Sequence, residues 1–181
     1  MADSPSRKLA VILHADVVGS TSLGQINETV AHERMLDAFK RFTTTIESYG
    51  GHTRELRGDA LVAEFARASD TLAAALVFQN ANDEHNASLE GEIRPRLRVG
   101  IAMGEVVIGD GTITGDGVVL AQRLEQLAYP GGVTIQDAVY QTVPKRLPFD
   151  YEGIGEQTLQ GFIEPVRAHV VLRRQVVSTV D

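Results

Sequence analysis

The chain has 181 residues, with 17 lysines and arginines against 24 aspartates and glutamates, and a net charge of −7. This length suits one domain with a well-buried core. The acidic balance gives no support to a nucleic-acid surface, which is usually basic. The lack of cysteine excludes disulfides, thiolate zinc sites and cysteine nucleophiles. No stretch approaches the roughly 18 apolar residues that a membrane helix needs, so we expect no membrane span and a cytoplasmic location.

Hydrophobic periodicity divides the chain into strands and helices. In the first half we expect a flexible leader at 1–7, a strand at 8–18, a helix at 30–46, and strands at 52–56 and 61–65 joined by a short hairpin. A helix capped by Ser69-Asp70 then runs to about 86. In the second half we expect strands at 97–103 and 106–108, a helix at 118–128, a strand at 133–135, a short helix from 136, a strand at 168–172 and a tail at 173–181. This order is the β-α-β-β-α-β pattern of a ferredoxin-like α+β sheet. We therefore expect one domain over 8–172, with a C-terminal extension to that core.

Two aspartates are the first candidates for chemistry. Asp16 lies in an apolar run, where an ionised carboxylate is costly unless it is compensated, although a strand-end aspartate can also turn to solvent or cap Ser20-Thr21-Ser22. Asp59 lies at the hairpin tip, where Gly-Asp is also ordinary turn chemistry. In a β-α-β-β sheet these two places can be adjacent. Two carboxylates there, beside the backbone amides that follow Asp16, would form an oxygen-rich pocket suited to Mg²⁺ or Mn²⁺.

Five collinear segments carry a more specific pattern. They are His14–Thr21 (HADVVGST), Gly58–Phe65 (GDALVAEF), Arg98–Val106 (RVGIAMGEV), Gly115–Glu125 (GDGVVLAQRLE) and Leu159–Val166 (LQGFIEPV). In that order they resemble the motifs F-x-D-I-x-G-S/T-T, G-D-x-x-x-A-x-F, R-x-G-I-x-x-G-E/x-V, G-x-x-V-N-x-A-x-R-L-E and L-K-G-x-x-x-P-V of class III adenylate and guanylate cyclase domains. The resemblance runs from about Lys8 to Leu172.

The resemblance implies a head-to-tail homodimer with active sites at the subunit interface. One subunit would supply the metal half of each site, in which two Mg²⁺ or Mn²⁺ ions lower the pKa of the ribose 3′-hydroxyl and neutralise the triphosphate. Asp16 and Asp59 match the metal-binding aspartates, together with the backbone of Val17. The phosphates would lie against backbone amides, with the N-terminus of the first long helix behind them. These amides belong to Val18, Gly19, Ser20 and Thr21.

The other subunit would supply the purine pocket and the transition-state groups. Arg123 matches the arginine that stabilises charge on the α-phosphate, although most helical arginines are simply exposed. Glu55 stands where adenylate cyclases have a purine-reading lysine. A glutamate accepts hydrogen bonds, which suits guanine, but it could also be a surface residue of an edge strand, paired with Arg54 or Arg57. Thr112 matches the second purine-contacting position, where adenylate enzymes often carry Asp or Thr.

Two departures weaken the expected substrate half. Val119 replaces an asparagine that orients the ribose, and Gln160 replaces a phosphate-binding lysine. We therefore expect a metal-dependent nucleotidyl cyclase that converts ATP, or GTP given Glu55, to the cyclic nucleotide with release of pyrophosphate. The alternative is a degenerate module that binds a nucleotide or a partner with little turnover. A diguanylate cyclase is disfavoured because its Gly-Gly-Asp/Glu-Glu-Phe motif is absent. His14 and His52 are set aside as metal ligands, because Mg²⁺ prefers oxygen.

Overall fold

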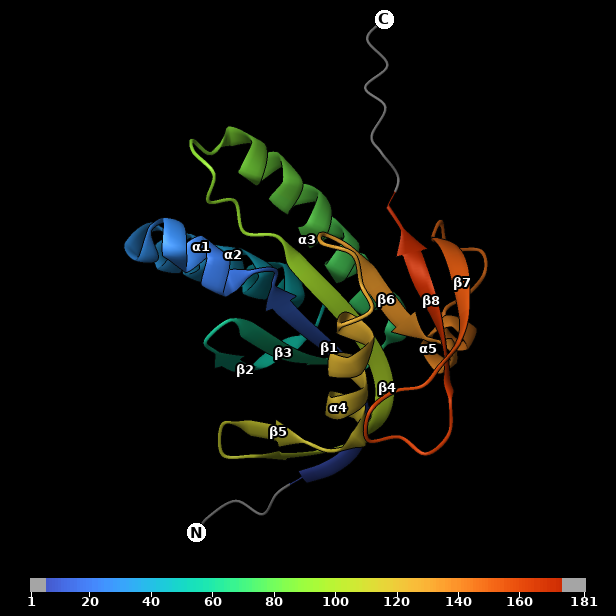
Figure 1. Cartoon of the computed structure of the whole chain (residues 1–181). Coiled ribbons are helices and arrows are strands. Elements are labelled where there is room, and N and C mark those ends of the chain that lie inside the picture. Colours follow the sequence, from blue (N-terminus) through green and yellow to red (C-terminus); the bar gives the residue numbers. More distant parts are fainter. Residues whose placement is uncertain (1–5, 174–181) are drawn as a thin grey trace, which may run out of the picture.

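The structure is a computed structural model that describes residues 6–173, and it forms one eight-stranded sheet covered by helices (Figure 1). The strands are β1 (Ser6–Val17), β2 (His52–Arg57), β3 (Ala60–Phe65), β4 (Leu97–Gly109), β5 (Thr112–Thr114), β6 (Val133–Gln136), β7 (Asp150–Gln157) and β8 (Val166–Leu172). The helices are α1 (Ser20–Ile26), α2 (Glu28–Ser48), α3 (Ala68–Ser88), α4 (Asp116–Glu125) and α5 (Asp137–Thr142). None of the helices within 6–173 is long and apolar enough to cross a membrane.

The sheet has the strand order β2-β3-β1-β4-β6-β8-β7, and β5 pairs with β4 off this path. The first four strands and the helices between them follow the β-α-β-β-α-β order, which confirms the predicted α+β core. Strand β1 lies in the middle, antiparallel to both β3 and β4. The C-terminal extension continues the same sheet. Strand β6 pairs in parallel with β4, β8 pairs antiparallel with β6, and β7 pairs antiparallel with β8 at the edge.

Two apolar cores cover the two faces of the sheet, and β1 contributes to both because its side chains alternate. Val11 and Leu13 belong to the core formed with α2 and α3. Ala10 and Ile12 belong to the core formed with α4. The same alternation places the next two even-numbered residues, His14 and Asp16, on the α4 face.

Helix α4 lies unusually close to β4 because position 100 is a glycine. A Cβ atom at Gly100 would lie 2.1 Å from the carbonyl oxygen of Ala121 and 2.3 Å from the amide nitrogen of Glu125. Any side chain at this position would therefore push the helix off the sheet. The close approach brings the last turn of α4, which includes Glu125, over the centre of β1 and β4.

The observed elements differ from the predicted ones in the second half of the chain: the strands predicted at 97–103 and 106–108 form the single strand β4, β5 was not predicted, and α4 spans Asp116–Glu125 instead of 118–128. Three further differences lie in the first half of the chain. Strand β1 begins at Ser6, where Ser6 and Arg7 pair with β4, so the predicted leader loses its last two residues. The rest of that leader, and the predicted tail beyond residue 173, lie outside the described residues. Helix α3 begins at Ala68 without a side-chain cap, so the predicted Ser69-Asp70 cap is wrong.

The third difference is helix α1, which the sequence did not predict. Gly19 precedes it in the left-handed conformation, with φ 63°. Asn27 then ends α1 and caps α2, accepting a hydrogen bond from the amide of Val30 at 3.1 Å. The long helix predicted at 30–46 is α2, which spans Glu28–Ser48, and the short helix α1 lies between it and the end of β1.

Candidate active site

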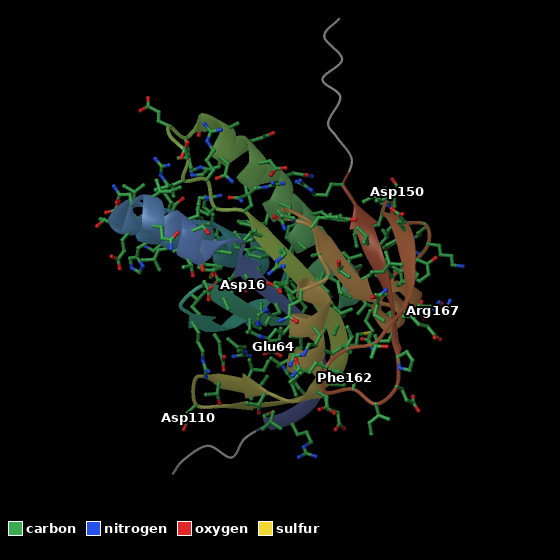
Figure 2. All side chains as sticks on the ribbon, in the orientation of Figure 1. Asp16, Glu64, Asp110, Asp150, Phe162 and Arg167 are labelled. Carbon is green, nitrogen blue, oxygen red and sulfur yellow. The ribbon has the colours of Figure 1, made fainter. Side chains whose placement is uncertain are left out.

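The end of β1 and the β2–β3 turn lie side by side, as the topology predicted. The amide of Val17 donates a hydrogen bond to the carbonyl oxygen of Asp59 at 3.0 Å, and Asp16 is paired with Ala60 across the ladder. Asp59 is exposed, and its Oδ2 accepts a hydrogen bond from the hydroxyl of Ser20 at 2.9 Å. Asp16 lies near the centre of the molecule in Figure 2, whereas Asp110 lies at the tip of the β4–β5 hairpin.

Asp16 is half-buried, and its Oδ1 has no hydrogen-bond partner among the described residues. Burial raises the pKa of its carboxyl above the ordinary range, and the nearby charge of Asp59 raises the pKa further. Arg98, which stands opposite Asp16 in β4, acts in the other direction. The two aspartates therefore repel each other in a site that only partly compensates them.

Sequence reasoning missed a third carboxylate at this place. Glu125 is 1% exposed, and its carboxyl lies against that of Asp16, to which it donates a hydrogen bond when protonated. Burial and the neighbouring charge of Asp16 raise the pKa of Glu125 to about 7, although Arg98 opposes this. Glu125 follows the buried Ala121 by one helical turn, and that spacing is the sequence feature that could have placed it on the inner face of α4.

The residues at this place fit a hard divalent cation. Carboxylate oxygens are the ligands that Mg²⁺ and Mn²⁺ prefer, and the unpaired, buried Oδ1 of Asp16 can accept one. A cation would also offset the repulsion between Asp16 and Asp59. Within the described residues no group of three or more His, Cys, Asp or Glu side chains is arranged to hold a metal, so these two aspartates are the candidate carboxylate ligands.

The backbone amides after Asp16 do not all remain available for phosphate. Val17 donates its amide to Asp59, and Val18 donates its amide to the carbonyl oxygen of Arg96 at 2.8 Å. The first backbone bond inside α1 is donated by Leu23 to the carbonyl of Gly19. The amides at the start of α1, from Ser20 onward, therefore have no partner inside the helix. Of the backbone amides that were predicted to bind phosphate, those from Ser20 onward therefore remain candidates. The helix behind them is α1, not the long helix that was predicted.

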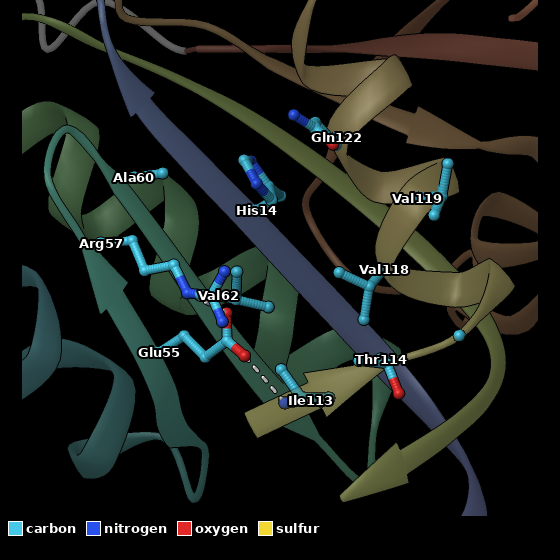
Figure 3. Close-up of a pocket in the computed structure, with 11 residues that line it drawn as sticks. His14, Glu55, Arg57, Ala60, Val62, Ile113, Thr114, Val118, Val119 and Gln122 are labelled. Carbon is cyan, nitrogen blue, oxygen red and sulfur yellow. Dashed lines mark hydrogen bonds and ion pairs between the residues drawn. The ribbon is translucent and has the colours of Figure 1, made fainter. Parts of the chain in front are cut away.

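A cavity of about 360 Å³ lies between α4, the β2–β3 hairpin and β5, and Figure 3 shows its lining side chains. Glu55 and Val119, two of the residues predicted to bind the nucleotide, both line it. Glu55 is already engaged, because its Oε1 accepts the amide of Ile113 at 2.9 Å and its Oε2 lies 3.3 Å from Nε of Arg57. Arg54, the other candidate partner, instead pairs with the buried Glu64.

His14 also lines this cavity and is 7% exposed. Burial lowers the pKa of its imidazole to about 4, although the charges of Glu55 and Asp59 oppose the shift. The ring is therefore neutral near pH 7. Its Nδ1 has no hydrogen-bond partner among the described residues.

The other residues predicted for the substrate half, Thr112, Arg123 and Gln160, do not line this cavity. Thr112 is exposed and is not part of the lining, whereas its neighbours Ile113 and Thr114 are. Arg123 is half-buried on α4, and its Nε donates a hydrogen bond to the backbone carbonyl of Gln160 at 3.0 Å. The fold thus joins two residues that are distant in sequence and that both match phosphate-binding positions of the cyclase motifs.

Asp59 and the base-pocket residues line different cavities of the same chain, and Asp16 lines neither of the two. Another cavity, of about 790 Å³, is lined by residues that include Ser20, Thr21 and Asp59. It shares no lining residue with the cavity that Glu55 and Val119 line.

The chain is similar to known cyclase domains. The model of the adenylate and guanylate cyclase catalytic domain matches residues 3–173. A Rhizobium meliloti (strain 1021) protein named "Putative adenylate cyclase 3" is 32% identical over 165 residues, which are 91% of this chain and 28% of that protein. An adenylate cyclase of Anabaena cylindrica is 32% identical over 147 residues, 72% of this chain and 29% of that protein. The chain thus spans under a third of the length of these relatives.

Solved structures of the same class share the fold. The adenylate/guanylate cyclase/hydrolase from Silicibacter pomeroyi superposes with a TM-score of 0.84 at 30% identity, covering 94% of this chain and 100% of that one. The adenylyl cyclase CyaB from P. aeruginosa has a TM-score of 0.81 at 19% identity, covering 96% and 98%. The chain belongs to the family of class III adenylate and guanylate cyclase catalytic domains.

Proposed function

We propose that this domain is a metal-dependent nucleotidyl cyclase, which converts ATP or GTP to the 3′,5′-cyclic nucleotide and releases pyrophosphate. The observation that carries the proposal is the pairing of Asp16 and Asp59, held together by the bond from the Val17 amide to the Asp59 carbonyl. The buried, unpaired Oδ1 of Asp16 is a ready ligand for a cation at this place. The family membership makes a purine nucleoside triphosphate the natural substrate class.

In this proposal the chain's own residues bind and orient the triphosphate. Asp16 and Asp59 hold two Mg²⁺ or Mn²⁺ ions, and the hydroxyl of Ser20 fixes the orientation of the Asp59 carboxylate. The ions supply charge neutralisation and a lowered pKa for the ribose 3′-hydroxyl that attacks the α-phosphorus. The free amides of Ser20 and Thr21, at the positive end of α1, bind phosphate oxygens.

The second half of the proposed site comes from another subunit. The support for this is that Asp59 and the base pocket line different cavities of one chain. A head-to-tail homodimer would bring the base pocket and Arg123 of one copy to the aspartates of the other. Arg123 is held in place through Nε, which leaves the end of its guanidinium to stabilise charge on the α-phosphate.

The altered residues of the base pocket favour a second candidate function. Val119 presents an apolar side chain to the cavity, and Gln160 has no charge to give a phosphate. Losing one preorganised donor commonly lowers kcat by about 10²–10³. A domain that binds the nucleotide with little turnover is therefore the alternative.

The test is to incubate the purified protein with Mn²⁺ and either ATP or GTP, and to measure the cyclic product and pyrophosphate. Wild-type protein should form one of the cyclic nucleotides, whereas Asp16→Ala should form none. Asp110→Ala is the matched control, because this exposed aspartate lies at the far hairpin tip. Nucleotide binding without product from either substrate would reject the enzyme in favour of the binding module. Sedimentation in the presence of nucleotide measures the proposed dimer.

A further inference from the structure

One polar side chain in the wall of the base cavity has no role in the proposed mechanism. His14 lies on the α4 face of β1, is 93% buried, and lines the cavity with Glu55 (Figure 3). Its Nδ1 is buried and bonds to no protein group within residues 6–173. Because Nδ1 itself is shielded, a ligand in the cavity would meet another edge of the ring. Most buried polar groups in proteins are hydrogen-bonded, so an imidazole in a cavity wall with an unpaired nitrogen points to a partner that the cavity receives.

Glu55, which lines the same cavity, is less available than His14 to bind a ligand, because both of its carboxylate oxygens already contact protein groups. Glu55 uses Oε1 to accept the amide of Ile113 and Oε2 to face the guanidinium of Arg57. Breaking either contact to read a base would leave a backbone amide or an arginine without its partner. Glu55 therefore holds β5 against β2, and a ligand in the cavity meets a side chain that is already bonded.

We propose that His14 contacts the base of the bound nucleotide and determines the affinity of this pocket for purines. The inference rests on the proposed function, because it assumes that the cavity receives a nucleoside triphosphate. The matching cyclase motif has phenylalanine at this position, and a phenyl ring has the same shape without a hydrogen-bonding atom. His14 thus adds a polar contact that the motif itself does not contain.

The chemistry of the ring defines which bases it accepts. A neutral imidazole has one donor and one acceptor nitrogen, and either tautomer can form. One tautomer pairs with an acceptor on the purine, and the other pairs with a donor. His14 therefore serves adenine and guanine alike, and distinguishes both from a polyphosphate without a base.

Calorimetric titration with α,β-methylene analogues of ATP and GTP and with inorganic triphosphate tests this inference. His14→Phe keeps the ring but removes the hydrogen bond, so the affinity for both analogues should fall about three- to tenfold while that for triphosphate stays unchanged. His14→Gln keeps a donor and an acceptor and should retain most of the affinity. His52→Phe is the matched control, since it makes the same change at an exposed histidine of β2.

A folding measurement separates this role from a structural one. His14→Phe removes an unpaired buried nitrogen, so its urea unfolding midpoint should rise while nucleotide affinity falls; a structural histidine would give a lower midpoint and unchanged affinity. Equal analogue affinity in wild type and His14→Phe would overturn the inference even where wild type makes cyclic nucleotide. Analogue binding that depends on His14, without product from ATP or GTP, would reject the cyclase and keep the base contact. Absence of analogue binding to wild type would reject the base contact.

Discussion

Glu125 gives the most direct physical test of the site, because its ionisation is linked to folding. The ordinary pKa of glutamate is 4.5, and burial raises that of Glu125 to about 7 in the folded chain. Between these two values the folded protein keeps a proton that the unfolded chain has lost. The contribution of Glu125 to stability must therefore fall as the pH rises from about 4.5 to about 7, and it levels off above that range. Burial lowers the pKa of His14 to about 4, so His14 contributes in the opposite direction over much the same range, and only the difference between wild type and a Glu125 variant isolates the Glu125 effect.

The size of the effect follows from the shift. A difference of roughly two and a half pKa units corresponds to about 3 kcal/mol between pH 4 and pH 8. Glu125→Gln has the shape of the protonated glutamate but does not ionise. The variant should lack this part of the pH dependence. Its free energy of unfolding relative to wild type should therefore rise by about 3 kcal/mol between pH 4 and pH 8.

Urea unfolding at intervals from pH 4 to pH 8, in buffer with a chelator, measures this difference. The chelator matters because a bound cation would offset the charge of Asp16, which contributes to the shift. Glu164→Gln, at an exposed position of the β7–β8 loop, should follow the wild-type curve. Parallel curves for wild type and Glu125→Gln would refute the reasoning, because they would mean that Glu125 is solvated or paired in the native protein.

Three further predictions concern the metal site, the packing of α4 and the altered substrate residues. Asp59→Ala should abolish Mn²⁺-dependent product while leaving the circular dichroism spectrum intact; retained turnover would contradict its metal role. Gly100→Ala should lower the urea midpoint strongly, because the new methyl group would overlap the backbone of α4, and a near-wild-type midpoint would contradict the close packing. Val119→Asn combined with Gln160→Lys should raise the rate of cyclic nucleotide formation by at least tenfold, since each restores a polar or charged group facing the substrate. An unchanged rate would show that these two positions do not limit turnover.

The adjacency of Asp16 and Asp59 was predictable from the sequence because it follows from topology alone. A strand end and a neighbouring hairpin meet wherever β1 pairs with β3, and the alternation along β1 decides which face Asp16 occupies. Helix α1 was not predictable, because its sequence, STSLGQI, is short, mostly polar and interrupted by Gly24. The long helix α2 was predicted correctly because five of its residues are buried at helical spacing.

Glu125 and the amide of Val18 were missed because their environment depends on tertiary contacts. Glu125 is buried only because Gly100, distant in sequence, lets α4 lie directly on β4. The amide of Val18 is unavailable because the chain entering β4 places the carbonyl of Arg96 beside it. A sequence pattern identifies residue types and faces. It does not show which partners have already used a hydrogen-bonding group.

Two of the unpaired buried groups within residues 6–173 lie close together on one strand. The imidazole of His14 and the carboxylate of Asp16 occupy successive positions on the α4 face of β1, about 7 Å apart along the strand. In the proposed dimer they serve different active sites, since His14 faces the base cavity and Asp16 lies beside the aspartate of the metal cavity. One strand would then place a base contact for one nucleotide and a metal ligand for the other. A displacement of β1 on binding the first nucleotide would therefore change the geometry of both sites.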